Sequence, residues 1–380
     1  MQLPDNLNKE IENRIKNDSY RILSEKSYPV DFFSNDYLGY AKNSIISEKS
    51  VSLLNTFKIK THGSTGSRLI SGNHELFKIL ENKAKDLLNA EAALFFNSGY
   101  DANLGLLSAI LKPKDVVFYD ELCHASIRDG LQMSNARAYK FKHNDYKDLV
   151  TKIELQNQRL QPQNVYIISE SVFSMDGDLS DIGELVTISK TFNAYLIVDE
   201  AHALGVCGKD FKGLSFEYNE DIFARIYTCG KALGSHGGFV LGSKTLKDYL
   251  INFSRPFIYT TGASPFHVAQ VIAALDYFEN EDKEKQELQK VISIFNDMVS
   301  SNQLQNKMST NASAIQHISC SGNSNAKALA ESLQRHGLGV KAILSPTVPK
   351  GKERIRLCLH NYNTKEQLQN LMSKAKKHIQ

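Results

Sequence analysis

The chain has 380 residues, of which 42% are hydrophobic and 23% charged, and its formal net charge at pH 7 is +3. This length exceeds a single simple core, so we expect one large domain, a smaller second domain and a surface able to support oligomerisation. Because the charges are balanced and form no long run of one sign, the composition argues against nucleic acid or a membrane surface as an obligate partner.

The cysteines and the N-terminal segment favour a cytoplasmic protein. The five cysteines are scattered, without a CxxC pair or a metal-ligand spacing, which predicts reduced, buried thiols and no metal site. Residues 1–26 alternate charged and apolar side chains, with no apolar run long enough for a signal peptide or a spanning helix. We interpret this segment as a docking helix.

The middle of the chain has the pattern of a parallel sheet. From about residue 60 to 265, short apolar runs alternate with helical patterns, which is typical of βαβ units. Strands are expected at 93–96, 116–119, 165–168, 195–198, 226–228 and 239–241. Most of these runs are too continuously apolar to face water.

The pattern of the C-terminal third of the sequence predicts a long helix followed by a mixed α/β tail. The helical pattern runs from Phe266 to about Val299, and strands are expected near 314–318 and 354–359. We therefore predict an N-terminal helix and arm (1–45), a large α/β domain (46–265), and a linking helix with a small C-terminal α/β domain (266–380).

Two polar residues at predicted strand ends suggest chemistry, because ligands of open α/β sheets bind at the carboxyl ends of strands. Asp199 follows the run 196–198, and His202 lies three residues beyond it. Lys231 lies in the small-residue turn 229–234 after the next strand. A lone strand-end acid is often structural and a lone lysine is usually solvated. Here, however, glycines leave room for a bulky ligand, and the neighbouring strands desolvate the amine.

Two further strand ends complete the pattern. Ser98, Gly99 and Tyr100 precede a helical run, an arrangement that suits a phosphate group but also an ordinary strand-to-helix turn. His124 lies near another helix start and offers a flat ring, although most isolated histidines are only satisfied polar residues. Jointly, an acid for a pyridine nitrogen, a lysine for an aldehyde, a phosphate turn and a stacking ring predict a pyridoxal 5′-phosphate (PLP) site.

Six stretches of the sequence resemble the α-oxoamine synthases, a branch of the fold-type-I PLP-dependent transferases. They are Asn35-Asp36-Tyr37-Leu38-Gly39, Gly63-Ser64-Thr65-Gly66-Ser67-Arg68, Asn97-Ser98-Gly99-Tyr100-Asp101-Ala102-Asn103, Phe173-Ser174-Met175-Asp176-Gly177-Asp178, Asp199-Glu200-Ala201-His202 and Gly230-Lys231-Ala232-Leu233-Gly234. The resemblance spans nearly the whole chain. It implies an α/β fold with a mainly parallel large-domain sheet and a smaller C-terminal α/β domain.

The resemblance also implies roles for individual residues. Lys231 is expected to carry the cofactor as a Schiff base and to move the Cα proton, Asp199 to keep the pyridine nitrogen protonated, and His124 to stack on the ring. His202 and Ser174 are expected near the phenolic oxygen. The phosphate is expected to be surrounded by Ser98, Gly99, Tyr100, Thr228 and, from a second subunit, Thr260 or Thr261. This arrangement implies a homodimer, with a simple pair of loop hydroxyls as the alternative for the two threonines.

The family joins a small amino acid to an acyl thioester with loss of carbon dioxide. The resemblance assigns the amino-acid carboxylate to Arg356 and further substrate contacts to Thr347 and Asn35. Arg21 is either a contact for the carboxylate of a pimeloyl chain or a solvated arginine. Local resemblance at 313–316 and 341–347 favours L-alanine and a pimeloyl thioester, with glycine and an acetyl thioester second. Whether coenzyme A or an acyl carrier protein carries the acyl group stays open, and the 31–34 connection is shorter than is usual in the family.

Other classes fit the sequence less well. A dinucleotide-binding oxidoreductase lacks its GxGxxG motif here, and the segment 63–68 lacks the lysine of a phosphate-binding P-loop. A cofactor-less partner subunit is the more serious alternative, because PLP-enzyme folds can lose their cofactor. The presence of Lys231, Asp199, His124 and His202 argues against it.

Overall fold

The computed structural model describes residues 3–23 and 25–379. The chain forms two compact units, each described by itself below. The larger comprises Asn35–Ser174 and Asp178–Gln286, and the smaller comprises Met1–Ser34, Met175–Gly177 and Glu287–Gln380. The chain thus passes from the larger unit into the smaller one for three residues and then returns.

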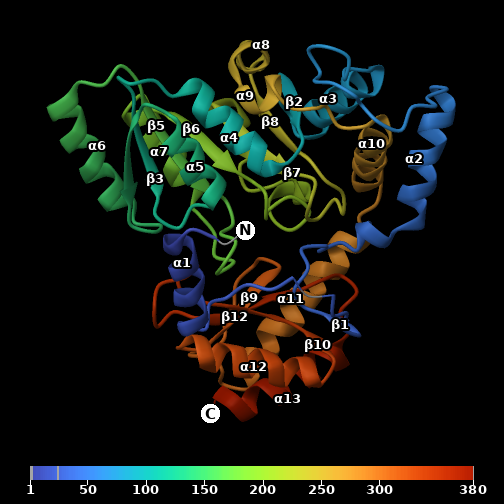
Figure 1. Ribbon diagram of the computed structural model, residues 1–380, viewed down its shortest axis with the longest axis vertical. Helices are drawn as coiled ribbons and strands as arrows, with labels where there is room; N and C mark the ends of the chain where they lie inside the picture. Colours follow the sequence, from blue (N-terminus) through green and yellow to red (C-terminus); the bar gives the residue numbers. More distant parts are fainter. Residues whose placement is uncertain (1–2, 24, 380) are drawn as a thin grey trace. The chain divides into compact units, whose positions relative to one another are not determined.

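The larger unit is built on a seven-stranded sheet in the order β2-β8-β7-β6-β5-β3-β4 (Figure 1). Its strands are β2 (Ala92–Phe96), β3 (Val116–Asp120), β4 (Arg137–Phe141), β5 (Val165–Glu170), β6 (Tyr195–Asp199), β7 (Ala224–Thr228) and β8 (Gly238–Gly242). Strand β8 is antiparallel to both of its neighbours, and the other strands of this sheet run in one direction. The predicted mainly parallel α/β fold is confirmed.

Alternate side chains of each strand enter different cores, because successive residues of a strand point to opposite faces of the sheet. Val117 packs in one core with α4 (Gly99–Ile110), α5 (Ala125–Met133) and α8 (Lys244–Phe253). Its neighbours Val116 and Phe118 pack in the other with α6 (Tyr146–Leu160) and α7 (Ile182–Thr191). Helices on both faces explain why the strands are apolar throughout.

The predicted helix from Phe266 to about Val299 is wrong as one element. The structure has α10 (Pro265–Asn280) and α11 (Lys283–Ser301), with Glu281 in an extended conformation between them. The buried Lys285 donates to the carbonyl oxygen of Phe278 (2.7 Å) and pairs with Asp282 (2.6 Å). These contacts satisfy the end of α10 and stabilise the break, which hydrophobic periodicity does not reveal.

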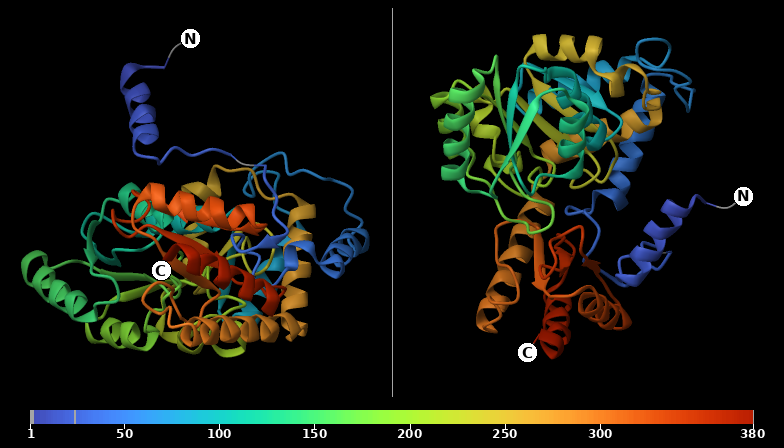
Figure 2. Two further views of the ribbon diagram at one scale, coloured as in Figure 1. Left: turned by 90° about the horizontal axis from the view of Figure 1, so that it is seen from below. Right: turned by 60° about the vertical axis from the view of Figure 1, so that its left-hand side comes forward.

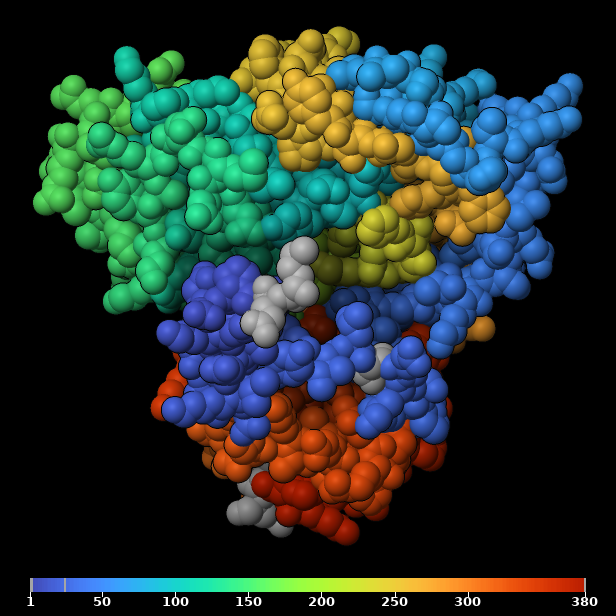
Figure 3. All heavy atoms as spheres, viewed as in Figure 1, coloured from blue at the N-terminus to red at the C-terminus, as the bar shows by residue number. Residues whose placement is uncertain are grey.

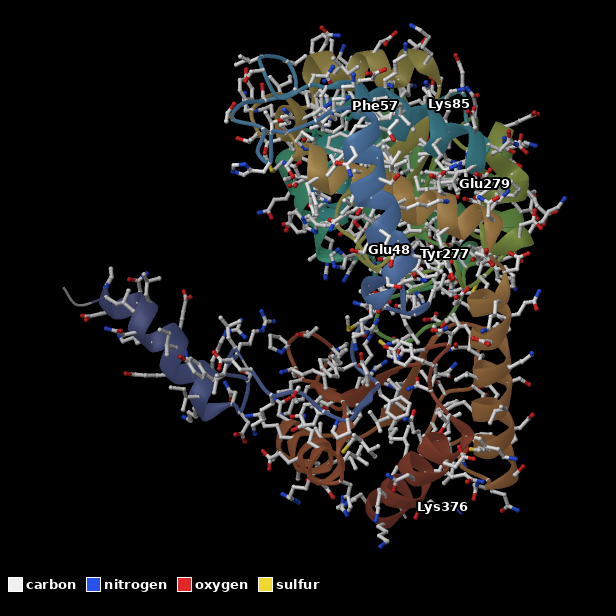
Figure 4. The ribbon with its side chains drawn as sticks, turned by 90° about the vertical axis from the view of Figure 1, so that its right-hand side faces the viewer. Glu48, Phe57, Lys85, Tyr277, Glu279 and Lys376 are labelled. Atoms are coloured by element: carbon white, nitrogen blue, oxygen red, sulfur yellow. The ribbon has the colours of Figure 1, made fainter. Side chains whose placement is uncertain are left out.

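Helix α10 packs against α2 (Ser44–Thr56) and α3 (Glu75–Leu87). Figure 4 shows α2 alongside α10, with Phe57 at the end of α2 and Tyr277 and Glu279 on α10. The ring of Tyr277 meets that of Tyr40 edge to face, with centroids 5.1 Å apart. The remaining short helices of the unit are η1 (Tyr40–Lys42), η2 (Lys209–Phe211), η3 (Phe216–Asp221) and α9 (Arg255–Ile258).

The sequence analysis predicted six strands of this sheet and missed β4. This strand lies at the edge of the sheet, and only Phe141 among its residues is buried. Arg137 and Lys140 are exposed, so the strand lacks the continuous apolar run that identified the others.

The smaller unit contains a three-stranded antiparallel sheet in the order β11-β12-β9. Its strands are β9 (Ile315–Ser319), β11 (Lys341–Ile343) and β12 (Arg354–Cys358), of which β9 and β12 were predicted. Helix α12 (Asn323–Arg335) packs against β11 and against α13 (Lys365–Ile379). The left view of Figure 2 shows these two helices, orange-red and red, side by side. The unit also holds α1 (Asp5–Lys16) and the parallel pair β1 (Val30–Asp31) and β10 (Leu338–Gly339).

Two sequence expectations concern thiols and membranes. All five cysteines are free thiols, four of them buried and Cys320 partly exposed. Among the helices that the structure describes, none combines the length and the apolar character needed to cross a membrane.

Candidate active site

The parallel strands of the larger unit end at one edge of the sheet, and three neighbouring strands each end in an acidic residue. These are Asp120 on β3, Glu170 on β5 and Asp199 on β6, and all three are buried. Glu170 and Asp199 are register partners across the β5–β6 pair. A buried carboxylate is costly unless it is hydrogen-bonded or paired, so the partners of these groups define the site.

Asp199 is held by neutral donors. One carboxylate oxygen accepts a hydrogen bond from the side-chain amide of Asn103 on α4 (2.7 Å), and the other accepts from the backbone N–H of Ala201 (2.8 Å). The same Asn103 amide donates to the hydroxyl of Ser126 (3.1 Å), which lies 2.8 Å from Nδ1 of His124. A continuous chain of hydrogen bonds therefore links Asp199 to His124.

This chain fixes the tautomer of His124. An amide NH2 only donates, so the Ser126 hydroxyl accepts from Asn103 and gives its own proton to Nδ1 of His124. The backbone N–H of Ser126 points to the same Nδ1 (3.2 Å). Although the ring remains accessible, loss of hydration lowers the pKa of His124; Asp199 opposes this effect, and Lys231 adds to it. His124 is therefore a neutral ring with its second nitrogen protonated.

Glu170 holds the backbone beside His124. Its carboxyl accepts a hydrogen bond from the backbone N–H of His124. Burial, followed by the charge of Asp199, raises the pKa of Glu170 to about 8. Glu170 is therefore mostly protonated at neutral pH.

Lys231 lies in the turn that joins β7 to β8. The turn is closed by backbone hydrogen bonds from Cys229 to Gly237 (2.9 Å) and from Gly234 to the carbonyl oxygen of Lys231 (2.8 Å). The charge of Lys231 acts on both His124 and Glu170 and favours their less positive forms. Because β7 runs parallel to β6, the turn after β7 that carries Lys231 lies at the edge of the sheet where Asp199 ends β6.

A glycine-lined approach lies at the N-terminus of α4. Ser98 caps this helix by accepting from the N–H of Asp101 (2.9 Å), which leaves N–H groups of the first turn for other partners. A Cβ atom on Gly99 would lie 3.1 Å from the hydroxyl oxygen of Thr228, and one on Gly238 would lie 2.8 Å from the Cα of Gly99. The structure thus brings together three of the predicted phosphate residues, Ser98, Gly99 and Thr228.

The other predicted phosphate residues lie nearby in the same chain. The Tyr100 hydroxyl donates to Asp129. The side-chain amide of Asn97 donates to the Thr260 hydroxyl (3.2 Å) and to the carbonyl oxygen of Thr261 (2.9 Å). These contacts lie within one chain, and a contribution from a second subunit remains a prediction.

His202 forms a cluster with two residues from the start of the unit. Its Nδ1 lies 2.7 Å from the hydroxyl of Tyr37, which also lies 3.2 Å from the side-chain oxygen of Asn35. Tyr37 is fully buried. The structure thus brings the predicted cofactor residue His202 into one cluster with the predicted substrate residue Asn35.

Three predicted substrate residues belong to the smaller unit. Arg356 is a buried residue of β12, and its guanidinium contacts the sulfur of Cys358 (2.8 Å). The guanidinium of Arg21 lies 3.4 Å from the hydroxyl of Thr347, and both residues line a cavity of about 1250 Å³. Arg21 and Thr347 are thus neighbours, although 326 positions separate them in the sequence.

Three residues of the site were missed by the sequence reasoning. Asn103 and Tyr37 lie inside stretches that carried the family resemblance, but nothing in the sequence assigned them partners. Glu170 could have been found, because it is an acid two positions after the predicted strand 165–168, much as Asp199 follows the predicted strand 195–198.

Comparison with known proteins identifies the class. The family model described as aminotransferase class I and II matches residues 29–374, and the chain belongs to this family. The sequence relatives and structural neighbours are acyl-transferring α-oxoamine synthases, which makes this chain a PLP-dependent acyltransferase.

Within this class, the sequence is similar to proteins named 8-amino-7-oxononanoate synthase. It is 38% identical to one from Emericella nidulans, over 91% of this chain and 88% of that protein. It is 33% identical to one from Lysinibacillus sphaericus, over 95% of this chain and 91% of that protein.

Two solved structures show the same overall fold. The 8-amino-7-oxononanoate synthase from Francisella tularensis matches with a TM-score of 0.76 and 27% identity, covering 92% of this chain and 97% of that chain. The serine palmitoyltransferase from Sphingomonas wittichii matches with a TM-score of 0.87 and 26% identity, covering 98% of this chain and 96% of that chain.

The residues at the edge of the sheet fit PLP. The Asp199 carboxylate accepts from Asn103 and from Ala201, and its oxygens can accept a further hydrogen bond from a protonated ring nitrogen. His124 offers a neutral ring face, Lys231 offers an amine, and the start of α4 offers N–H groups for a phosphate. Because Gly99 has no side chain, the backbone beside Thr228 stays uncovered.

This cradle leads to a first prediction. In Gly99→Ala, the new methyl group would press against Thr228 and cover the N–H groups at the start of α4. We expect the dissociation constant for PLP to rise about tenfold, which corresponds to about 1.4 kcal/mol. Fluorescence or absorbance titration of the apoprotein measures it.

The control is Thr187→Ala, because Thr187 is exposed on α7 and its hydroxyl donates to the carbonyl oxygen of Gly183 in the same helix (2.9 Å). This variant should bind PLP like the wild type. Equal PLP affinity of both variants and the wild type would contradict a phosphate site at the start of α4.

Proposed function

We propose that the protein condenses L-alanine with a pimeloyl thioester, releasing carbon dioxide and the thiol, to form 8-amino-7-oxononanoate for biotin synthesis. The observation that carries this proposal is the similarity, over most of both chains, to proteins named 8-amino-7-oxononanoate synthase. The acyl carrier is either coenzyme A or an acyl carrier protein, and kinetics with thioesters of both carriers distinguish the two.

The residues at the edge of the sheet would hold PLP. When bound, PLP supplies an aldehyde that links to amines and a ring that withdraws electrons from the attached Cα. Asp199 would pair with the protonated ring nitrogen, because a neighbouring carboxylate favours the cationic form. His124 would cover one face of the ring, and the start of α4 with Thr228 would hold the phosphate.

Lys231 and Arg356 would guide the reaction. Arg356 would bind the carboxylate of the amino acid through two parallel N–H donors and thereby orient the Cα–H bond. The Lys231 amine, displaced by the substrate amine, would accept the Cα proton and become an ammonium group. After the Cα attacks the thioester carbonyl, the sulfur leaves as a thiolate that takes a proton from water, and the carboxylate departs as carbon dioxide. Lys231 would then return a proton to the Cα.

A patch of exposed apolar side chains near the proposed phosphate site supports a homodimer. The segments 57–74 and 253–266 adjoin at the surface of the larger unit and are linked by hydrogen bonds between Gly262 and Gly66 (3.0 Å) and between Ser64 and Ala263 (2.9 Å) (Figure 3). Large apolar side chains are exposed here: Leu69, Ile70, Phe253, Tyr259 and Phe266. A second copy of the chain would bury them next to the site.

The first test of this proposal concerns Lys231. In Lys231→Ala, no covalent link between protein and cofactor can form, so borohydride should no longer fix the cofactor on the protein. The rate of product formation should fall at least about 100-fold, because the base for the Cα proton is lost. Mass spectrometry of the reduced protein and a product assay measure both effects.

Lys244→Ala is the control, because Lys244 is exposed and pairs only with Asp248 on its own helix in the contacts described (2.7 Å). In this variant, borohydride should fix the cofactor on the protein as it does in the wild type. If the wild-type protein with PLP is not modified by borohydride, the proposed chemistry is wrong.

A second test concerns the amino acid. Supplied with L-alanine, glycine or L-serine in heavy water, the PLP-loaded protein should exchange the Cα proton of alanine fastest, because a small methyl side chain is the proposed fit. Proton NMR follows the exchange. Fast exchange of glycine with almost none of alanine would reject the substrate assignment and leave the family assignment intact.

A third test concerns the acyl end. We propose that Arg21, beside Thr347, binds the terminal carboxylate of the pimeloyl chain. In Arg21→Met, KM for the pimeloyl thioester should rise about tenfold, whereas KM for the heptanoyl thioester, which lacks the carboxylate, should change little. Steady-state kinetics with both thioesters, each on coenzyme A and on acyl carrier protein, measure this.

Arg14→Met is the matched control, because Arg14 lines the same cavity. If Arg21→Met impairs the two thioesters equally, Arg21 does not recognise the terminal carboxylate.

A further inference from the structure

We propose that His143 is a positioning residue of the cofactor site, an imidazolium that clamps the turn carrying His124 to the loop carrying Ser174. The inference rests on the proposed function only where it concerns cofactor binding. His143 follows β4, the edge strand that the sequence analysis missed, and it was not among the candidate residues.

Both ring nitrogens of His143 face carboxylates. Nδ1 lies 3.0 and 3.1 Å from the two oxygens of Asp120, and Nε2 is hydrogen-bonded to Asp178. The side chain of Asp120 has no exposed surface, and that of His143 is 23% exposed. An ionised carboxylate only accepts hydrogen bonds. A hydrogen bond to each of the two carboxylates therefore requires a proton on each ring nitrogen of His143.

Asp120 organises the turn that leads to His124. It is the last residue of β3, and its carboxylate accepts from the backbone N–H of Leu122 (2.8 Å) and of Asn144 (2.9 Å). The turn ends at His124, which caps α5. His143 therefore neutralises the buried carboxylate around which this turn is folded.

Asp178 closes the loop that carries Ser174. Its carbonyl oxygen accepts from the N–H of Phe173 (3.0 Å), and the next pair outward, Val172 and Leu179, forms a β-bridge. The ring of Phe173 meets the edge of His143, with centroids 4.4 Å apart and planes at 88°. His143 thus contacts both sides of the loop base, directly beside Ser174.

The charges around His143 keep it protonated. Burial by itself lowers the pKa of His143, but the hydrogen bonds and charges of Asp120 and Asp178 outweigh burial and raise the pKa to about 10. The carboxylate of Glu121 also faces this residue and accepts from its backbone N–H (3.4 Å). A neutral side chain here would leave the fully buried Asp120 charge without its cation, which is strongly unfavourable.

The protonated state can be tested without the cofactor. In apoprotein labelled with ¹⁵N-histidine, both ring nitrogens of His143 should show the shifts of an imidazolium from about pH 6 to about pH 9. An ordinary histidine has lost its charge at the upper end of this range. His143→Gln identifies the signals. A neutral His143 at pH 7 in the wild-type apoprotein would overturn the proposal.

The same clamp predicts a pH-dependent stability. The pKa of His143 is raised from 6.5 to about 10 in the folded chain. Its contribution to stability is therefore complete below about pH 6.5 and is lost as the pH rises through about 10. The difference in urea midpoint between wild type and His143→Gln should shrink over this range.

The positioning role is tested on the PLP-loaded protein. His143→Gln and Asp178→Asn should each weaken PLP binding about tenfold and change the circular dichroism of the bound cofactor. The double variant should be no worse than the worse single variant, because both remove the same contact. His336→Gln, an exposed histidine of the other unit, should behave like the wild type.

The outcomes separate the two proposals. If wild-type protein binds no PLP, the proposed function fails, whereas the apoprotein spectra still decide the charge of His143. If wild type binds PLP and His143→Gln binds it with the same affinity and dichroism, the positioning role is wrong. If His143→Gln does not fold, Asp178→Asn and the wild-type spectra decide.

Discussion

The structure of the candidate site depends on one constraint: parallel strands end together, so their terminal side chains share one buried edge. Asp120, Glu170 and Asp199 end three adjacent strands. Three carboxylates cannot all be ionised there without partners, because burial and mutual repulsion disfavour the charged forms. The surrounding residues are therefore arranged largely by the need to satisfy these acids.

Each acid is satisfied in a different way, and the differences make the site suitable for a cationic ring. Asp120 has the imidazolium of His143, and Glu170 is mostly protonated at neutral pH. Asp199 accepts hydrogen bonds from the side-chain amide of Asn103 and the backbone N–H of Ala201. These donors orient the carboxylate before a ligand arrives, so little reorganisation is needed on binding.

The same hydrogen bonds orient the aromatic part of the site. Asn103 links the Asp199 carboxylate to Ser126 and through it to His124, so the proposed anchor of the ring nitrogen and the proposed stacking ring share one hydrogen-bond network. Helix α4 supplies both Asn103 and the N-terminus that faces Thr228. One helix thus sets the distance between the two ends at which a planar phosphorylated cofactor would be held.

The sequence by itself determined the parallel sheet, the strand-end positions of Asp199 and Lys231 and the family, because apolar runs and short motifs are local signals. It did not reveal β4, whose exposed face is charged, or the break between α10 and α11, which depends on the contacts of Lys285. Only the tertiary structure decided that Asn103 reaches Asp199 across 96 positions and that His143 lies between Asp120 and Asp178. Which residues become partners depends on their proximity in the folded chain, and this proximity cannot be read from their spacing in the sequence.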